Sequence, residues 1–259
     1  MTRRARVTFL GTGTSHGVPM IGCACRVCTS SDPRDRRWRP SIYLELPGVA
    51  ALVDTSTDLR AQALHFRIPR VDAILFTHSH ADHVLGLDEV RRYNAIQGGS
   101  IPCFADAATA ADLRRTFFYI FDSRTPASGG VPRIELFTLQ GEFCLGATEV
   151  VPVPLLHGRR LILGYRIGCF AYLTDCSSIP DASWELLAGV DLLVLDALRH
   201  RPHPTHLTVE QAVAIAERLG PSRAYLTHIA HDLPHAATCA LLPAGVELAY
   251  DGLIVEFAV

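Results

Sequence analysis

Four potential metal ligands are packed into six residues directly after an apolar segment. The segment 73–76 reads Ala-Ile-Leu-Phe, typical of a buried strand, and it is followed by His78, His80, Asp82 and His83. Imidazole and carboxylate groups are the usual protein ligands of zinc, manganese and iron. A strand or a regular helix cannot direct all four at one ion, whereas a tight loop leading into a helix can share them between two. The run therefore predicts a metal centre at a strand end, where α/β proteins place their chemistry.

Three later residues each follow a predicted apolar strand, as His78 does. They are His157, Asp175 and His228, after predicted strands at 148–153, 170–173 and 224–226. If these strands run to a common rim, their three side chains meet the 78–83 run there. The repeated placement is stronger evidence for a metal site than any single histidine.

Three cysteines, Cys23, Cys25 and Cys28, lie in a polar loop from about residue 15 to 39. A loop of that length is functional, pinned by a metal, or disordered. Three thiolates at this spacing favour a structural zinc site that takes one more Cys or His. Free thiols and a redox role are the alternatives, although the spacing lacks the helix-start context of thioredoxin-like motifs. The other five of the eight cysteines are expected in the core, because a reducing compartment disfavours disulfides.

The remaining pattern predicts one α/β domain spanning residues 1–259. Further strands are expected at 7–10, 42–46, 50–53, 73–76, 134–137, 162–166, 192–195 and 253–257. Helices are expected at 57–66, 106–118, 182–187 and 208–219, the last with Thr208 and Gln211 as a capping box. Each half of the chain reads as a run of strands followed by helices, which suits two stacked sheets with helices outside.

Charge and hydropathy limit the partners. The net charge is −2, so the composition does not indicate the basic surface that binding a polymeric nucleic acid requires. No apolar run approaches the length of a transmembrane helix and no export signal is recognised, so we expect no membrane association and a cytoplasmic location. The aromatic run 117–121 precedes a Ser-, Gly- and Pro-rich segment, 123–132, that is expected to be mobile. Core packing is the default for the aromatic run, and a homodimer contact or a substrate lid is the alternative.

Together these residues resemble the metallo-β-lactamase superfamily over the whole chain. The resemblance implies an α/β fold of the αββα four-layer sandwich type, with two divalent cations at one edge between the sheets. It divides the ligands into His78, His80 and His157 for the first metal and Asp82, His83 and His228 for the second, with Asp175 bridging both. Manganese and zinc both suit such a ligand set.

Further motifs resemble one subgroup, the PhnP-type phosphodiesterases of the carbon–phosphorus lyase pathway. They are Gly11 to Ser15, Gly22 to Cys28, Pro202 to His206 and Leu226 to Asp232. The subgroup's activity implies hydrolysis of a small phosphorylated substrate, 5-phosphoribosyl 1,2-cyclic phosphate, to ribose 1,5-bisphosphate. The resemblance also points to His231 as the fourth ligand of a structural zinc that ties the cysteine loop to the rim of the active site.

Other polar residues have supporting roles in this interpretation. His206, on a Pro-rich loop, is the candidate to protonate the leaving oxygen or to hold a substrate phosphate, and Asp82 is counted with it as catalytic. Asp54 and Asp196 each follow a strand and either orient a metal-binding histidine or cap a turn. A solvated surface is expected for Arg34, Arg36, Arg37, Arg39, His200 and His203.

Three other functions use the same kind of centre. A 2′,3′-cyclic nucleotide phosphodiesterase would act on a related small ester. A nuclease, such as a tRNA 3′-processing enzyme, would need a basic surface that the charge balance does not indicate. A thioesterase or lactonase would use the same two metals to attack a carbonyl carbon. A β-lactamase is disfavoured by Asp175, since the resemblance assigns those enzymes no such carboxylate.

Overall fold

Two seven-stranded sheets are packed face to face in the computed structural model, which describes residues 3–126 and 130–259. The first sheet comprises β1 (Arg4–Gly11), β2 (Ser41–Leu46), β3 (Val49–Val53), β4 (Ala73–Leu75), β5 (Ile101–Ala105), β6 (Ile134–Thr138) and β14 (Ile254–Ala258), in the order β14-β1-β2-β3-β4-β5-β6. The second comprises β7 (Phe143–Leu145), β8 (Thr148–His157), β9 (Arg160–Ile167), β10 (Phe170–Leu173), β11 (Leu192–Asp196), β12 (Arg223–Thr227) and β13 (Val246–Leu248), in the order β13-β12-β11-β10-β9-β8-β7.

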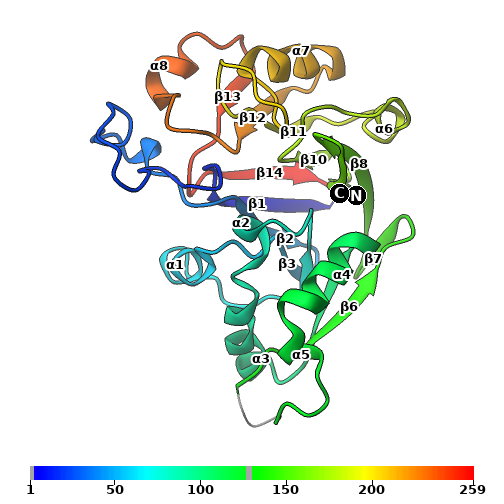
Figure 1. Cartoon of the computed structure of the whole chain (residues 1–259). Helices are drawn as coiled ribbons and strands as arrows, with labels where there is room; N and C mark the ends of the chain where they lie inside the picture. Colours follow the sequence, from blue (N-terminus) through cyan, green and yellow to red (C-terminus); the bar gives the residue numbers. More distant parts are fainter. Residues whose placement is uncertain (1–2, 127–129) are drawn as a thin grey trace.

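Helices cover the outer face of each sheet (Figure 1). On the first sheet they are α1 (Leu59–His65), α2 (Ala81–Val84), α3 (Arg91–Gln97), α4 (Ala107–Thr116) and α5 (Phe118–Phe121), with the 3₁₀ turns η1 (Pro33–Asp35) and η2 (Leu87–Val90) along the chain. On the second they are α6 (Asp181–Leu186), α7 (Val209–Leu219) and α8 (His235–Cys239). The fold is therefore the predicted α/β four-layer sandwich.

The middle layers are held by side chains that alternate along the strands. In β10, Phe170 and Tyr172 pack into the cluster between the two sheets, whereas Ala171 and Leu173 pack under the helices of the second sheet. Both faces of such a strand are buried, which explains its uninterrupted apolar sequence. At the rim the sheets are joined directly, because the Tyr165 hydroxyl donates a 2.6 Å hydrogen bond to the carbonyl oxygen of Phe76.

Parallel pairing brings the ends of several strands to one rim. β3, β4, β5 and β6 are parallel neighbours in the first sheet, and β10, β11, β12 and β13 are parallel neighbours in the second. The carboxyl ends of parallel strands lie on the same edge of a sheet. The residues that follow these strands therefore gather along one seam between the sheets.

The sequence interpretation placed the long elements correctly and missed short ones. The capping box of α7, with Thr208 and Gln211, is confirmed. The missed elements are β5, β7, β13, α2, α3, α5 and α8, most of which are too short to show a clear hydrophobic periodicity. In the aromatic run, Phe117 is buried in the core as expected, while Phe118 is 66% exposed. Of the segment expected to be mobile, residues 127–129 lie outside the described part of the chain.

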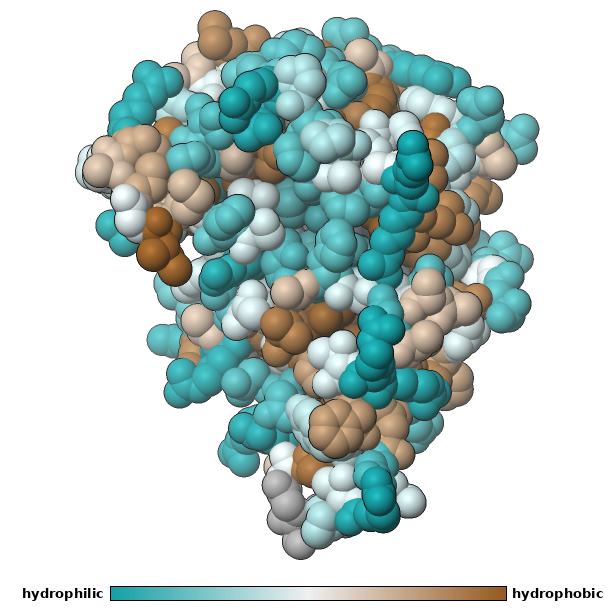
Figure 2. Space-filling model, viewed as in Figure 1, coloured by the Kyte–Doolittle hydropathy of each residue, from teal (hydrophilic) through white to brown (hydrophobic). Residues whose placement is uncertain are grey.

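The surface shows no extended hydrophobic face in the direction of Figure 2, where hydrophobic residues form separate patches among hydrophilic ones. Large exposed apolar side chains such as Ile21, Phe118 and Leu241 come from distant parts of the chain. Of the helices in the described ranges, none has both the length and the hydrophobicity that crossing a bilayer requires.

Gly86 allows α2 to lie against the loop after β3, and its replacement should be costly. Its N–H donates to the carbonyl oxygen of Thr55 (2.9 Å), and a Cβ at this position would overlap the carbonyl oxygen of Ser56 and lie 2.8 Å from Leu59 Cβ. We expect Gly86→Ala to lower the free energy of unfolding of the metal-loaded protein by about 1–3 kcal/mol, because the crowded atoms belong largely to backbone. Urea denaturation measures this change.

Gly99→Ala is the matched control. A Cβ at Gly99 would meet nothing within 4 Å, so the same substitution there should change the free energy of unfolding by less than about 0.5 kcal/mol. Equal losses in the two variants would contradict the steric explanation.

Candidate metal centre

Strand ends position the side chains of the centre. Asp54 follows β3, His78 follows β4 after two residues, Asp175 follows β10 after Thr174, and His228 directly follows β12. His157 differs from the prediction, because it is the last residue of β8 itself: antiparallel pairing with β9 extends that strand well past residue 153.

The structure brings the predicted ligands together in two groups. Ligand atoms of one group, His78, His80 and His157, lie within 4.8 Å of one another. The same is true of the other group, Asp82, His83, Asp175 and His228. These groups match the two ligand sets that the family resemblance implied, and each draws on both sheets.

Distances within the centre suit ligands around ions rather than hydrogen bonds. The Asp175 Oδ2 atom lies 3.1 Å from His228 Nε2, 3.3 Å from His83 Nε2 and 3.7 Å from His78 Nε2. Nitrogen ligands at the usual zinc distance in a tetrahedral site are about 3.4 Å apart. Among the described residues, these three buried Nε2 atoms and Asp82 Oδ2 have no hydrogen-bond partner. Because burying unsatisfied polar atoms is unfavourable, the residues present fit divalent cations.

The electrostatics of the second group favour positive charge. Burial lowers the pKa of His83, yet Asp175, Asp82 and Asp54 attract its proton and raise its pKa well above the usual value. Burial is likewise outweighed at His228, where Asp175 and Asp82 raise the pKa to about 10. A cluster of carboxylates that attracts protons into a buried site attracts a divalent cation by the same field.

The histidines of the first group are kept neutral. Burial is the largest cause of the lowered pKa of His78, His80 and His157, and the neighbouring imidazoles of His83, His157 and His206, respectively, add to it. A neutral imidazole offers a lone pair to a metal, whereas a protonated one does not. The first group is therefore ready to act as ligands at neutral pH.

Hydrogen bonds fix which nitrogen of each histidine faces the centre. The His83 Nδ1–H donates to Asp54 Oδ2 (2.6 Å), and the His157 Nδ1–H donates to the carbonyl oxygen of Asp175 (2.6 Å). Both bonds leave Nε2 free for a metal. Asp54 also accepts two 2.8 Å bonds from the amide and hydroxyl of Thr77. The predicted contact between Asp54 and a candidate ligand is present.

Asp196 holds His206 beside the two groups. Its carboxylate lies 3.1 Å from His206 Nδ1 and accepts from the backbone N–H of Leu207 (2.8 Å) and of Asp175 (3.1 Å). The His206 ring stacks on His228 with 4.7 Å between ring centres. His206 is therefore buried next to the metal ligands, where it can contact a substrate.

Three residues of the centre adopt the left-handed backbone conformation. The φ angles are 64° at Asp54, 59° at Asp175 and 60° at His228. This conformation costs a non-glycine residue about 1–3 kcal/mol, and such strain concentrates at functional sites. It turns each side chain sharply off its strand end and into the seam.

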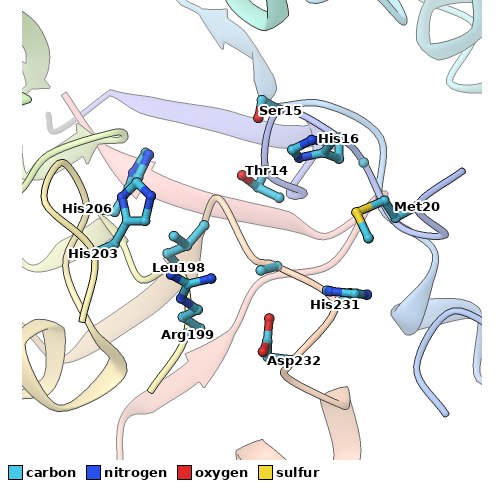
Figure 3. Close-up of a pocket in the computed structure, with 12 residues that line it drawn as sticks. Thr14, Ser15, His16, Met20, Leu198, Arg199, His203, His206, His231 and Asp232 are labelled. Atoms are coloured by element: carbon cyan, nitrogen blue, oxygen red, sulfur yellow. The ribbon is translucent and has the colours of Figure 1, made fainter. Parts of the chain in front are cut away.

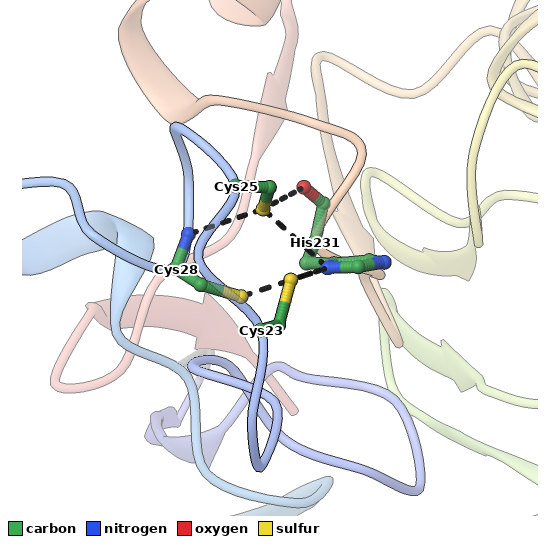
Figure 4. Close-up of side chains that lie close together, drawn as sticks. All are labelled: Cys23, Cys25, Cys28 and His231. Atoms are coloured by element: carbon green, nitrogen blue, oxygen red, sulfur yellow. Dashed lines mark hydrogen bonds between the residues drawn. The ribbon is translucent and has the colours of Figure 1, made fainter.

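A second cluster brings the cysteine loop to His231 (Figure 4). The His231 Nδ1 atom lies 3.2 Å from Cys23 Sγ and 3.5 Å from Cys25 Sγ and Cys28 Sγ. A backbone N–H of Cys28 lowers the pKa of the Cys25 thiol to about 6, which favours the thiolate. Three sulfur atoms and one nitrogen atom at this spacing fit a tetrahedral zinc.

The loop that carries the cysteines is also anchored by an arginine. Arg37 was expected on a solvated face, but it is only 2% exposed. Its guanidinium donates to the carbonyl oxygen of Ala249 (2.7 Å) and to Thr12 Oγ1 (3.2 Å), which joins the loop to the ends of two strands of the fold. The buried hydrogen bonds, which the sequence does not reveal, overturn the prediction.

A cleft of about 220 Å³ lies between His206 and the cysteine cluster (Figure 3). Its walls come from residues 14–20, 198–206 and 230–232. His203 was expected at the surface, but it is half-buried and lines this cleft, as does Arg199. One feature of the sequence indicated this position, because Arg199 and His203 lie in the same short loop as His206. His200 is exposed, as predicted.

Comparison with known proteins gives the family. Residues 50–229 match the beta-lactamase superfamily domain. A solved structure described as a new diphosphatase from the PhnP family is 49% identical, with a TM-score of 0.94 over 100% of this chain and 99% of that one.

Two curated relatives carry other names. An octanoyltransferase of Porphyromonas gingivalis is 38% identical over 96% of this chain, but the chain spans only about half, 51%, of its length. A ribonuclease Z of Anoxybacillus flavithermus is 26% identical over 85% of each chain. The chain belongs to the beta-lactamase superfamily, and its fold is that of the metal-binding hydrolases in that superfamily.

Proposed function

We propose that this protein is a dinuclear metal-dependent phosphodiesterase. Its expected substrate is 5-phosphoribosyl 1,2-cyclic phosphate, and its expected product is ribose 1,5-bisphosphate. The observation that carries the proposal is the place of Asp175, whose Oδ2 atom lies 3.7 Å from His78 Nε2 in one ligand group and 3.1 Å from His228 Nε2 in the other. A carboxylate between the groups can bridge two cations, as two-metal phosphoryl chemistry requires.

The reaction uses residues of both sheets. The two ligand groups would hold two divalent cations, which would lower the pKa of a bound water and supply positive charge for the phosphoryl oxygens. The water oxygen forms a bond to phosphorus, one ring P–O bond breaks, and the leaving oxygen takes a proton. His206 can donate that proton from Nε2, because Asp196 holds its Nδ1 at 3.1 Å. Asp82, whose buried Oδ2 is unpartnered, would hold one of the cations through that atom, and we assign to its other carboxylate oxygen the proton of the attacking water.

The similar proteins support phosphorus chemistry. A diphosphatase of the PhnP family is 49% identical to this chain, so attack on phosphorus is the natural expectation. That description makes hydrolysis of a diphosphate the second candidate function, since the same residues could support attack on a phosphorus atom of a P–O–P linkage. Transfer of an octanoyl group is not proposed, because that relative is about twice as long as the match. Cleavage of RNA is not proposed, because the net charge of −2 offers no phosphate-binding surface for a polymer.

We further propose three bound metals of two kinds. Zinc or manganese occupies the dinuclear centre, since histidine and carboxylate ligands suit both. One structural zinc is held by Cys23, Cys25, Cys28 and His231, whose ligand atoms lie within 4.8 Å of one another. Such a zinc closes a loop of more than two hundred residues, which stabilises the folded state by restricting the unfolded chain.

A substrate panel tests the proposed reaction. Purified protein of defined metal content should hydrolyse 5-phosphoribosyl 1,2-cyclic phosphate with a higher kcat/KM than 2′,3′-cyclic nucleotides, an aryl phosphodiester, a nucleoside diphosphate or structured RNA. Phosphorus NMR identifies the product. A higher kcat/KM for any other member of this panel would replace the proposed function.

Substitutions at the centre should separate catalysis from metal binding. His206→Ala should lower kcat by about 10²–10⁴ while both catalytic metals stay bound, because it removes the proton donor only. Asp175→Ala should abolish turnover and release at least one ion, because both groups lose the shared carboxylate. Metal analysis with activity measurements checks both. His200→Ala is the control, since His200 is exposed on the same loop and should leave kcat and metal content unchanged.

The cysteine cluster should retain its zinc when the protein is treated with a weak chelator. The wild-type protein should then keep about one zinc per chain after the catalytic metals leave, and Cys25→Ser should lose it, because the remaining ligands cannot complete the tetrahedral site. Metal analysis after dialysis against a weak chelator gives the measurement. Cys144 was expected in the core but is exposed on the edge strand β7, outside the cluster, so Cys144→Ser is the matched control. Retention of the zinc by Cys25→Ser would refute the site.

A further inference from the structure

The first ligand group of the metal centre takes its three histidines from both sheets. His78 and His80 lie in the segment after β4, whereas His157 is the last residue of β8. The ring centre of His157 lies 5.5 Å from that of His78 and 5.0 Å from that of His80. A metal held by this group would therefore depend on how the two sheets are placed relative to each other.

Strand β9 connects the two parts of this group. The backbone N–H of Leu163 donates to the carbonyl oxygen of Thr77 (3.0 Å), and the Arg160 guanidinium donates to Ser79 Oγ (2.7 Å). In the ladder between β8 and β9, Arg160 also lies opposite His157. Arg160 therefore links the strand that carries one ligand to the residue that lies between the other two in the sequence.

The same serine is held from the outer layer by Asp112 of α4. The Ser79 hydroxyl donates to Asp112 Oδ2, and the Arg160 guanidinium donates to the same oxygen (3.2 Å). Helix α4 is itself fixed on the first sheet, where its Leu113 is fully buried in the core. Because the hydroxyl of Ser79 both donates and accepts, its position is set by two layers of the fold.

The charge of Arg160 is already paired in this arrangement. Its guanidinium forms an ion pair with Asp112 and a hydrogen bond with Ser79 through the same nitrogen atom. The other oxygen of Asp112 pairs with Arg115 (2.8 Å), whose side chain is 80% exposed. Arg160 is therefore placed to hold the loop of the metal centre rather than to bind an anion.

We propose that Ser79, Asp112 and Arg160 are positioning residues that hold the first ligand group in its metal-binding arrangement. The inference rests on the dinuclear centre proposed above and adds the residues on which the affinity for its first metal depends. Replacing a side chain that orients metal ligands typically costs about 10–100-fold in metal affinity. In the second group, His83 is oriented by Asp54 instead, so the effect should fall on one of the two metals.

A cobalt titration tests the network without catalysis. The dinuclear centre is emptied with a weak chelator while zinc stays at the cysteine cluster, and the absorption of added Co²⁺ gives a Kd for each catalytic ion. Ser79→Ala, Asp112→Ala and Arg160→Ala should each weaken one ion about tenfold or more and leave the other within about twofold. Asp112→Asn, which keeps an oxygen acceptor, should lose less affinity than Asp112→Ala.

A double variant identifies the metal that is affected. His80→Ala removes a ligand of the first group, so adding Arg160→Ala to it should not weaken the remaining ion further. A further loss of about tenfold in the double variant would overturn the assignment to the first group.

Arg115→Ala is the matched control. It changes the net charge by the same amount as Arg160→Ala and removes a partner of the same carboxylate, but from the exposed face of α4. This variant should keep both Kd values within about twofold of the wild type. An equal loss in Arg115→Ala, or an equal weakening of both ions in Arg160→Ala, would contradict the proposal.

Kinetics separates the positioning of a metal from binding of the substrate. With the best substrate of the panel, Arg160→Ala should need more metal for activity but reach the wild-type KM at saturating metal. A raised KM at saturating metal, with unchanged metal affinity, would assign Arg160 to the substrate and refute the proposal. If the wild type binds fewer than two Co²⁺ ions beside its zinc, the dinuclear centre itself fails. If it binds two and the three variants match it, the positioning network alone fails.

Discussion

The fold depends on a group of carboxylates buried at the seam between its two sheets. Asp54, Asp175 and Asp196 are fully or almost fully buried there, and Asp82 is nearly so. Negative charges at such places are tolerated only when they are paired and hydrogen-bonded. Imidazoles and backbone N–H groups supply part of this pairing. The proposed divalent cations would complete it, and the centre would then also help to hold the two sheets together.

The rest of the seam is built to hold this charge in place. Asp54 receives bonds from Thr77 and His83, and Asp196 receives them from Leu207 and the backbone of Asp175. Each carboxylate thus fixes a residue from a different strand end. The left-handed φ angles at Asp54, Asp175 and His228 show that backbone strain is accepted to gain this arrangement. Local preference alone would not place these side chains in the seam.

The residues of this centre are recognisable from the sequence because the evidence is local: His78, Asp175 and His228 each come shortly after an apolar strand. The layers were predictable for the same reason, since buried strands and amphipathic helices such as α7 show clear hydrophobic patterns in the sequence. Burial that depends on distant partners was not predictable. Arg37 resembles its neighbours Arg36 and Arg39 in the sequence, but it is an interior residue that donates to Thr12 and to the carbonyl oxygen of Ala249, more than two hundred residues away. The cleft is likewise formed by three separate segments, so no single sequence motif predicts it.

One short stretch of chain connects the three parts of the site. His228 belongs to the metal centre, and Ile229 pairs with Gly13 and accepts from the N–H of Thr14 (3.1 Å), which joins the cysteine loop to the second sheet. His231, three residues after His228, meets the cysteines and also lines the cleft. Because residues 228–231 cannot move as separate pieces, a metal at the cysteine cluster would hold the cleft wall at a fixed distance from the reacting atoms. A ligand that reached from the metal centre into the cleft would meet parts of one rigid segment at both ends, and such an arrangement favours selection by length.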